Sequence, residues 1–161
     1  MSLHNSHIVP GDSFSKVTTR RKWYLIYISG QVRGQLSRNG KRYMVNRLIA
    51  DYDSGENKSD KEGEKLIGFS LDNAIVGLCG LNVEPTNGKY GRIRRLYILP
   101  EYRNRGIGTR LVKHLIRYAG RNFEGIVVNI GELPVDNFYR SLGFRSVSNS
   151  SFTHFLALSV R

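Results

Sequence analysis

One stretch of the chain, residues 93–119, constrains the possible fold more than any other. Residues 93–99 are rich in β-branched and aromatic side chains, which predicts a strand, and Pro100 ends it. From residue 107 to residue 119 the apolar residues recur at the spacing of one helix face, and Gly120 follows as a C-cap. A strand, a basic turn and a helix N-terminus are therefore expected in direct succession.

The turn has the features of an anion-binding site. The first N–H groups of a helix have no partner within the helix, and the helix dipole favours negative charge there. Gly106 and Gly108 let a ligand approach the backbone, and Arg103, Arg105 and Arg110 supply positive charge. A pyrophosphate group suits this arrangement, and an arginine-rich turn that only faces solvent is the alternative interpretation.

Two common phosphate-binding loops do not fit the turn. A P-loop has Lys followed by Ser or Thr after its last glycine, whereas Thr109 and Arg110 follow Gly108. A dinucleotide-binding fingerprint has Gly or Ala where this chain has Leu111. Neither loop type therefore explains the turn.

The same residues carry a family resemblance. Residues 103–108, Arg-Asn-Arg-Gly-Ile-Gly, match the Arg/Gln-x-x-Gly-x-Gly/Ala motif of the GNAT acyl-CoA N-acyltransferase superfamily, and residues 96–102 are similar to the strand before that motif. Residues 137–144 resemble the second signature of the family, a helix that carries Phe-Tyr and ends in Gly-Phe. The resemblance covers roughly residues 64–160. It implies an α/β, GNAT-like acyl-CoA N-acyltransferase fold with a mixed central β-sheet flanked by helices.

The resemblance also implies a reaction, the transfer of the acetyl group of acetyl-CoA directly to a primary amine. In relatives the central strand splays from its neighbour, and main-chain groups matching Leu96 and Ile98 bind the pantetheine chain. Backbone N–H groups around Leu96 are then the expected oxyanion donors. Tyr139 matches the tyrosine that protonates the CoA sulfur. An ordinary ladder residue and a packed tyrosine are the alternative interpretations of Leu96 and Tyr139.

Acetyl-CoA is thus the expected cosubstrate, with no metal. The residues expected to contact it are Leu96, Tyr97, Ile98, Arg103, Asn104, Arg105, Gly106, Ile107, Gly108, Thr109, Arg110, Asn137 and Tyr139. The chain departs from the family after the fifth strand, because Glu132 stands where relatives often have Asn. Asn129 and Asn137 are the nearby substitutes on the pantetheine side.

The general base is the second departure from the family pattern. Many relatives have Glu on the central strand at the position that Arg92 occupies here. Glu84, at the end of the preceding strand, is the best carboxylate by position, with Asp51 and Asp53 as second choices, and all three can equally be surface acids. Water chains, or an acceptor amine that is already weakly basic, are the remaining routes to deprotonation.

Three functions remain open from the sequence. The first is acetylation of a small-molecule amine, anionic if Arg92 and Arg94 face the acceptor. The second is acetylation of a macromolecular amine, an aminoacyl-tRNA or a protein. The third is a non-catalytic CoA-binding sensor, since the family's glutamate is missing.

Charge is unevenly distributed along the chain, whose formal net charge is +12. Residues 13–50 contain no acidic residue and are strongly basic, whereas residues 51–64 are acidic and lack an apolar pattern. The basic third is suited to RNA or to the phosphates of a ligand, or is a solvated face without a partner. The acidic stretch predicts a mobile surface loop over about residues 52–63.

The 161 residues fit one domain, 1–161, with apolar residues making up 40% of the chain, enough for a core. No apolar run approaches 18 residues, so no membrane-spanning helix is expected. Residues 1–12 lack the apolar core of a signal sequence. The single Cys79, expected to be buried, fits a reducing, cytoplasmic compartment, and the four histidines show no metal-ligand spacing. Relatives are often dimers, which makes a homodimer a candidate assembly.

The remaining elements follow from local patterns. Asp12 or Ser13 can cap a helix over about residues 14–28, which a strand near residues 7–9 would precede. Alternatively, residues 23–28 are themselves the first strand. The helix is the favoured interpretation. A helix is expected at about 42–52. The other expected elements are strands 65–71 and 74–83, a central strand from about Arg92, a strand at 125–130, a helix at about 134–142, and strands 144–147 and 152–160. Gly77 and Gly80 inside the strand at 74–83 suggest close packing or a bulge.

Overall fold

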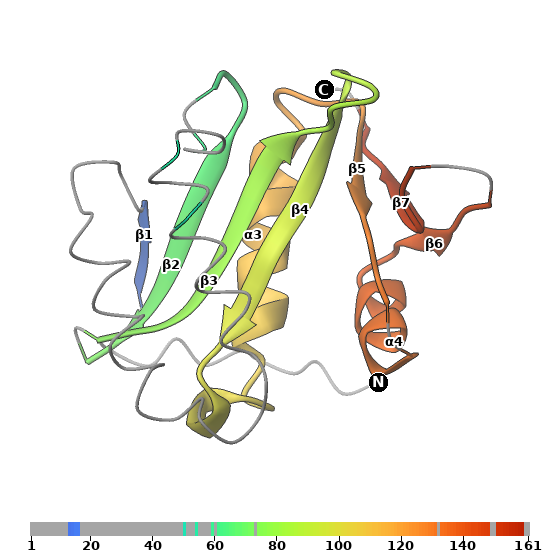
Figure 1. The fold of residues 1–161 in the computed structure, drawn as a ribbon. Helices are drawn as coiled ribbons and strands as arrows, with labels where there is room; N and C mark the ends of the chain where they lie inside the picture. Colours follow the sequence, from blue (N-terminus) through green and yellow to red (C-terminus); the bar gives the residue numbers. More distant parts are fainter. Residues whose placement is uncertain are drawn as a thin grey trace.

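The computed structural model describes residues 13–16, 50, 54, 59, 61–72, 74–131, 133–148 and 151–159. Within this part the strands form one seven-stranded sheet in the order β1-β2-β3-β4-β5-β7-β6 (Figure 1). The elements are β1 (Ser13–Lys16), β2 (Lys65–Leu71), β3 (Ala74–Val83), β4 (Tyr90–Ile98), η3 (Pro100–Tyr102), α3 (Ile107–Ala119), β5 (Gly125–Val128), α4 (Leu133–Ser141), β6 (Arg145–Ser146) and β7 (His154–Ala157).

The sheet is mixed, as the sequence predicts. Strands β1 to β4 pair antiparallel in succession, β4 pairs parallel with β5, and β7 pairs antiparallel with both β5 and β6. The parallel pair requires a crossover connection, and α3 supplies it on the face of the sheet turned away from the viewer in Figure 1. This architecture confirms the expected α/β fold class.

Helix α3 packs its apolar stripe on the centre of the sheet. Leu111, Val112 and Leu115 are fully buried, and the helix ends at Gly120 as predicted. An added Cβ at Gly77 on β3 would lie 2.7 Å from Ile98 Cδ1 and 3.2 Å from Leu111 Cδ1. Because glycine leaves this room, helix and sheet approach closely, which confirms the close packing expected in β3.

The local patterns predicted most element bounds well. Strands β2 and β3 and helix α3 have the predicted bounds, whereas β4 starts at Tyr90, two residues before the predicted Arg92. Helix α4 lies one residue earlier than predicted. The predicted strands 125–130, 144–147 and 152–160 are longer than the observed β5, β6 and β7. The observed strands end where backbone pairing with the neighbouring strand ends, whereas the apolar sequence pattern used for the prediction continues beyond that point.

The favoured N-terminal helix is wrong where the structure can test it. Residues 13–16 form β1, which pairs with the edge of β2 from Ser13↔Ser70 to Lys16↔Ile67. The Phe14 ring lies 5.3 Å from the Phe69 ring, between centroids, and 4.6 Å from that of His114. These contacts and the open β2 edge favour a strand over the local helical spacing.

Other N-terminal expectations lie outside the described residues. This holds for the strand near 7–9, the alternative strand 23–28, most of the basic third and most of the acidic loop. Of the predicted helix at 42–52, only Ala50 is described, and it is helical, with its carbonyl accepting a hydrogen bond from the Ser54 N–H at 2.9 Å.

A β-bulge interrupts the β3–β4 pair. Leu78 lies opposite Tyr97 and Gly80 opposite Arg94, so Cys79 faces both Arg95 and Leu96. Arg95 has φ 59°, a left-handed conformation that is uncommon outside glycine. The bulge takes Arg95 and Leu96 out of the one-to-one ladder and bends β4 before its C-terminal end.

Candidate active site

The site is organised by an opening between β4 and β5. These parallel strands pair at three positions, Tyr90↔Gly125, Gly91↔Ile126 and Arg92↔Val127, and the register ends there although β4 continues to Ile98. Figure 1 shows β4 and β5 side by side at one end and diverging toward the other, where α4 and the start of α3 lie. The splay that the resemblance implies is therefore present.

The predicted pantetheine-binding residues lie on the free part of β4. Leu96 and Ile98 are half-buried, and Tyr97 is buried. Leu96 follows the bulged Arg95 and lies past the last β5 partner, so its backbone is placed where a ligand can replace a neighbouring strand. An N–H group in such a position suits an oxyanion that develops in the opening.

The turn before α3 is exposed and open at its centre. Asn104 and Gly106 have φ values of 58° and 75°, and a Cβ added at Gly106 would meet nothing within 4 Å. The Arg110 N–H donates to the Gly106 carbonyl at 3.0 Å, so the N–H groups before Arg110 precede the first helical bond. An anionic group fits this position in both space and charge.

Gly108, in the first turn of α3, lies close to α4 and to β4. A Cβ at Gly108 would lie 3.6 Å from Phe138 Cζ and 3.9 Å from Ile98 Cγ1. Gly108 thus lies beside the Phe138 ring of α4, where a Cβ would make ordinary van der Waals contact. Its predicted contact with the cosubstrate stays a prediction.

The side chains of the three arginines in the turn, Arg103, Arg105 and Arg110, contact different groups. Arg103 Nε donates to the Ile98 carbonyl at 3.0 Å, which ties the turn to the end of β4. The Arg105 guanidinium lies 5.3 Å from the Tyr102 ring centroid, and that of Arg110 lies 4.5 Å from the Phe69 ring. Arg103 and Arg105 are exposed beside the turn, whereas half-buried Arg110 leans toward β2.

Tyr139 is the buried residue of α4, with 4% of its surface exposed. Its ring packs edge-on against Phe138 and Phe144, at centroid distances of 5.0 and 5.3 Å. Burial, together with the nearby Cys79, raises the pKa of the Tyr139 phenol well above its usual range. The hydroxyl therefore stays protonated at neutral pH, as a proton donor must.

Cys79 and Asn137 also have clear positions. Cys79 is fully buried, as predicted, and burial raises the pKa of its thiol. Asn137 is exposed on α4, two residues before Tyr139. Its predicted role on the pantetheine side stays a prediction.

A polar clamp holds α4 against β7. The buried His154 places Nε2 2.7 Å from Asp136 Oδ1, and Arg140 Nε donates to Asp136 Oδ2 at 2.6 Å. The Arg140 guanidinium and His154 outweigh desolvation and hold the pKa of the Asp136 carboxyl below its usual range. Since Asp136 lies one turn before Tyr139, the clamp fixes the helix that presents the phenol.

Glu84, the predicted base, is bonded to Arg92. The Arg92 Nε donates to Glu84 Oε2, and the Thr86 N–H and hydroxyl donate to Glu84 Oε1 at 3.2 and 2.8 Å. Burial alone would raise the pKa of Glu84, but these hydrogen bonds outweigh it and hold that pKa below its usual range. Glu84 is 1% exposed. The structure thus joins Glu84 to the arginine that replaces the family's glutamate.

Ser151 connects this ion pair to the segment before β7. Its carbonyl accepts hydrogen bonds from Arg92 Nη2 at 3.4 Å and from Asn129 Nδ2 at 3.2 Å, and its hydroxyl lies 2.9 Å from the Thr86 hydroxyl. Asn129 also accepts a bond from the Thr153 N–H at 3.1 Å. Asn129 is therefore engaged with residues 151–153, at the paired end of the β4–β5 opening.

Substituting Glu84→Gln is expected to destabilise the fold by roughly 2 kcal/mol, because it leaves the half-buried Arg92 without its counter-charge. The lowered pKa means that the ionised Glu84 stabilises the native state above its unfolded pKa of about 4.3, and that this stability is lost as pH falls through the lower folded pKa. Urea unfolding at pH 7 and pH 3.5 measures both effects. The wild type should lose part of its advantage over the variant at pH 3.5, and an advantage that grows there would contradict the ion pair.

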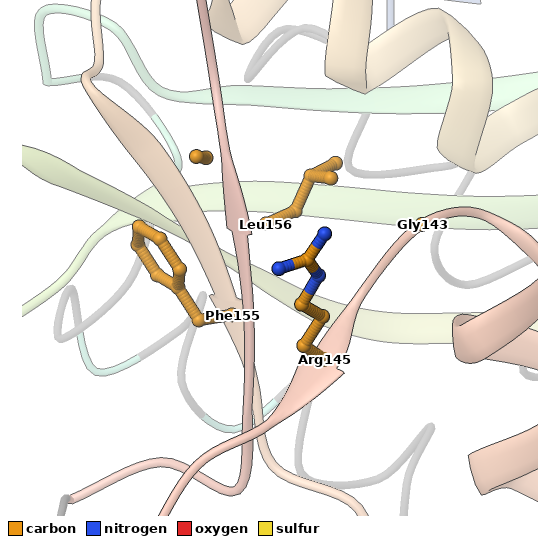
Figure 2. A pocket seen from close by; sticks show the side chains of 5 residues that line it. Gly143, Arg145, Phe155 and Leu156 are labelled. Atoms are coloured by element: carbon orange, nitrogen blue, oxygen red, sulfur yellow. The ribbon is translucent and has the colours of Figure 1, made fainter.

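A separate cavity of about 320 Å³ lies at β6 and β7. It is lined by Gly143, Arg145, Phe155, Leu156 and Ala157, and Figure 2 shows the Arg145 guanidinium beside the Leu156 side chain, with the Phe155 ring on the other side of the strand. None of the residues predicted for the active site lines this cavity. It therefore plays no part in the candidate site.

The described residues contain no group of three or more His, Cys, Asp or Glu side chains placed to hold a metal ion. Among the helices in this part of the chain, none is long and apolar enough to span a membrane.

Comparison with known proteins now identifies the family. The sequence model of the acetyltransferase (GNAT) family matches residues 31–144, more than half of the chain. The chain belongs to the GNAT acetyltransferase family. A curated N-alpha-acetyltransferase of Sulfurisphaera tokodaii is 25% identical over 116 residues, which cover 70% of this chain and 69% of that protein.

Solved GNAT structures share the fold. An acetyltransferase from Exiguobacterium sp. 255-15 superposes with a TM-score of 0.70 at 25% identity, covering 91% of this chain and 93% of that one. The PaiA N-acetyltransferase from Thermoplasma acidophilum, solved in complex with coenzyme A, gives a TM-score of 0.62 at 14% identity, with coverage of 92% and 98%. The GNAT fold therefore extends over the chain well beyond the two signatures.

Sequence reasoning missed the Glu84–Arg92 pair and the Ser151 bonds. Glu84 and Arg92 flank the turn at residues 85–88, and the register pairs Asn82 with Arg92, which makes Glu84 a diagonal neighbour of Arg92. Opposite charges across a short hairpin were the available signal. Ser151 gave none, because its partners come from distant parts of the chain.

Proposed function

We propose that this GNAT protein transfers the acetyl group of acetyl-CoA to the nitrogen of a primary amine. The observation that carries the proposal is the β4–β5 opening, which has the bulged Leu96 on one side, the exposed N-terminus of α3 at its end and Tyr139 on α4. Three chemical needs are met by these parts: diphosphate binding, oxyanion stabilisation and a proton donor.

The residues present fit acetyl-CoA. The open space and positive φ at Gly106, with the free N–H groups of α3, suit the diphosphate. In the proposed reaction the amine nitrogen attacks the thioester carbonyl carbon, a C–N bond forms and the C–S bond breaks. The Leu96 N–H stabilises the carbonyl oxygen, and Tyr139 gives its proton to the departing sulfur.

A second candidate differs only in the acceptor, a protein amine in place of a small molecule. It is favoured by the similarity to the curated N-alpha-acetyltransferase. The hypothesis of a small anionic acceptor loses part of its basis, because Arg92 is paired with Glu84 and half-buried. An anion that approached Arg92 would compete with a carboxylate already in place.

Two measurements on the purified protein test the proposal. Acetyl-CoA should raise the thermal midpoint in a concentration-dependent way, because it binds the folded state only. Release of CoA thiol should then depend on an added amine and should be matched by acetylated product. A folded protein with no midpoint shift at millimolar acetyl-CoA would contradict the cofactor assignment. Binding without turnover of any amine would instead assign the chain as a CoA-binding sensor.

A further inference from the structure

The polar clamp on α4 continues past His154 to the end of β5. His154 lies on β7, is buried, and places Nε2 2.7 Å from Asp136 Oδ1. Asp136, whose lowered pKa keeps it ionised at neutral pH, can only accept hydrogen bonds, so the Nε2–H of His154 is the donor. On the other side of the ring, Nδ1 lies 3.0 Å from the Thr153 hydroxyl oxygen. Both nitrogens of the imidazole are thus held by polar groups.

Thr153 connects this ring to the strand that forms one wall of the opening. Its hydroxyl oxygen accepts a hydrogen bond from the Ile130 N–H at 2.9 Å, and its hydroxyl donates to the Val128 carbonyl at 3.1 Å. Val128 is the last residue of β5 and lies beyond the last pair of β5 with β4. His154 therefore joins α4 to the end of β5 that borders the opening.

Apolar packing alone restrains α4 weakly. Within its nine residues, all of which the structure describes, Tyr139 is the one buried side chain, with half-buried Phe138 beside it. The hydrophobic effect is non-directional, so burial of these rings draws the helix to the sheet without fixing its rotation or its sliding. A hydrogen bond has a preferred length and angle. The bond between His154 and Asp136 therefore sets the position of α4 along β7 and about its own axis.

The position of α4 decides where the Tyr139 phenol lies. Burial and, to a smaller extent, the nearby Cys79 raise the pKa of this phenol. Cys79 lies on β3 opposite the bulge, where it faces both Arg95 and Leu96. The phenol and the backbone of Leu96, the proposed oxyanion donor, are thus neighbours of the same residue. A proton donor acts within about 3 Å of its acceptor atom, and a displacement of about 1 Å can cost about a hundredfold in rate.

Given acetyl transfer as the proposed function on which this rests, we propose that His154 is a positioning residue for the reaction. Its Nε2–H holds Asp136, and thereby α4, where the Tyr139 hydroxyl meets the sulfur beside the bulge. His154 acts through the helix, because its two ring nitrogens are already engaged by Asp136 and Thr153. It takes no proton from the acceptor and gives none to the sulfur.

Two variants of His154 separate its two hydrogen bonds. In His154→Gln the amide nitrogen is as many bonds from Cβ as Nε2 is in histidine, so it can still donate to Asp136. In His154→Asn the amide nitrogen corresponds to Nδ1 and keeps only the contact with Thr153. We expect the Asn variant to lose at least about tenfold in kcat and the Gln variant less than about threefold, with the Kd for acetyl-CoA within about threefold in both.

Amine-dependent release of CoA thiol gives kcat, and calorimetric titration gives Kd, at a temperature where each variant is folded. A merely structural role would lower the unfolding midpoint of both variants without separating their kcat values. His114→Asn is the control, because this half-buried histidine of α3 contacts Phe14 of β1, and it should keep kcat within about twofold. Equal kcat in the wild type and His154→Asn, or equal losses in the Asn and Gln variants of His154, would overturn the positioning role.

Combination with Tyr139→Phe tests whether His154 acts through the phenol. In that background His154→Asn should lower kcat by less than about twofold, because the proton donor that it positions is already gone. The same tenfold loss in both backgrounds would overturn the positioning role. A wild-type protein that binds acetyl-CoA but acetylates no amine would instead contradict the proposed function, whereas an active wild type matched by His154→Asn would contradict the positioning role alone.

Discussion

The variant Gly106→Asp is expected to bind acetyl-CoA about a hundredfold more weakly than the wild type. Gly106 is the N-cap of α3, has φ 75° and is open to solvent. An aspartate tolerates this conformation better than most residues, and its carboxylate can bond the same free N–H groups that the diphosphate needs. Competition and like-charge repulsion together account for about 2.7 kcal/mol, which is a hundredfold in Kd.

The variant Gly106→Asn is the matched control, because it has the same shape and tolerance for positive φ but no charge. It should lose no more than about tenfold in affinity. Gly88→Asp adds the same charge at another exposed glycine with free space around it and should bind as the wild type does. Calorimetric titration with acetyl-CoA measures all three. Equal losses in the Asp and Asn variants would show that bulk and not charge matters at Gly106.

The parts of this site that could be predicted are those encoded in short stretches of sequence. The bounds of α3 follow from the spacing of its apolar residues, and the β2–β3 hairpin follows from two apolar runs around a tight turn. The two signatures placed Gly106 and Tyr139 at one opening because the family fixes their order along the chain. The family model and the fold confirm the family and the fold class, whereas the roles of Gly106 and Tyr139 stay predictions.

The parts that could not be predicted depend on contacts between distant residues. Residues 13–16 have a helical spacing, but the β2 edge and the Phe69 ring make them a strand. The left-handed Arg95 results from a bulge against Cys79, and no local pattern demands it. In the same way, the surroundings of Arg92 depend on the hairpin register that brings Glu84 beside it. The arginine at the position of the family's glutamate is thus half-buried in the fold and paired with the buried Glu84.

The variant Tyr139→Phe is expected to lower kcat about a hundredfold while changing the Kd for acetyl-CoA less than about threefold. The substitution keeps the ring, which packs against Phe138 and Phe144, and removes only the hydroxyl that we propose as the proton donor to the sulfur. General-acid contributions of this kind are typically 10²–10⁴-fold, so about a hundredfold is the lower end. Stopped assays of CoA release and thermal unfolding of the same samples separate lost chemistry from lost folding.

The pH dependence of the wild-type rate provides a second test of Tyr139 as the proton donor. An acid supports turnover while it is protonated, and the rate falls as pH rises through its pKa. Because burial raises the pKa of Tyr139, the falling limb should lie above the range near pH 10 where a free phenol ionises. Tyr118→Phe removes a hydroxyl from the half-buried ring beneath Lys65 and should leave kcat within about twofold. If Tyr139→Phe keeps the full rate, the proton reaches the sulfur from water and Tyr139 serves only to pack α4 against the sheet.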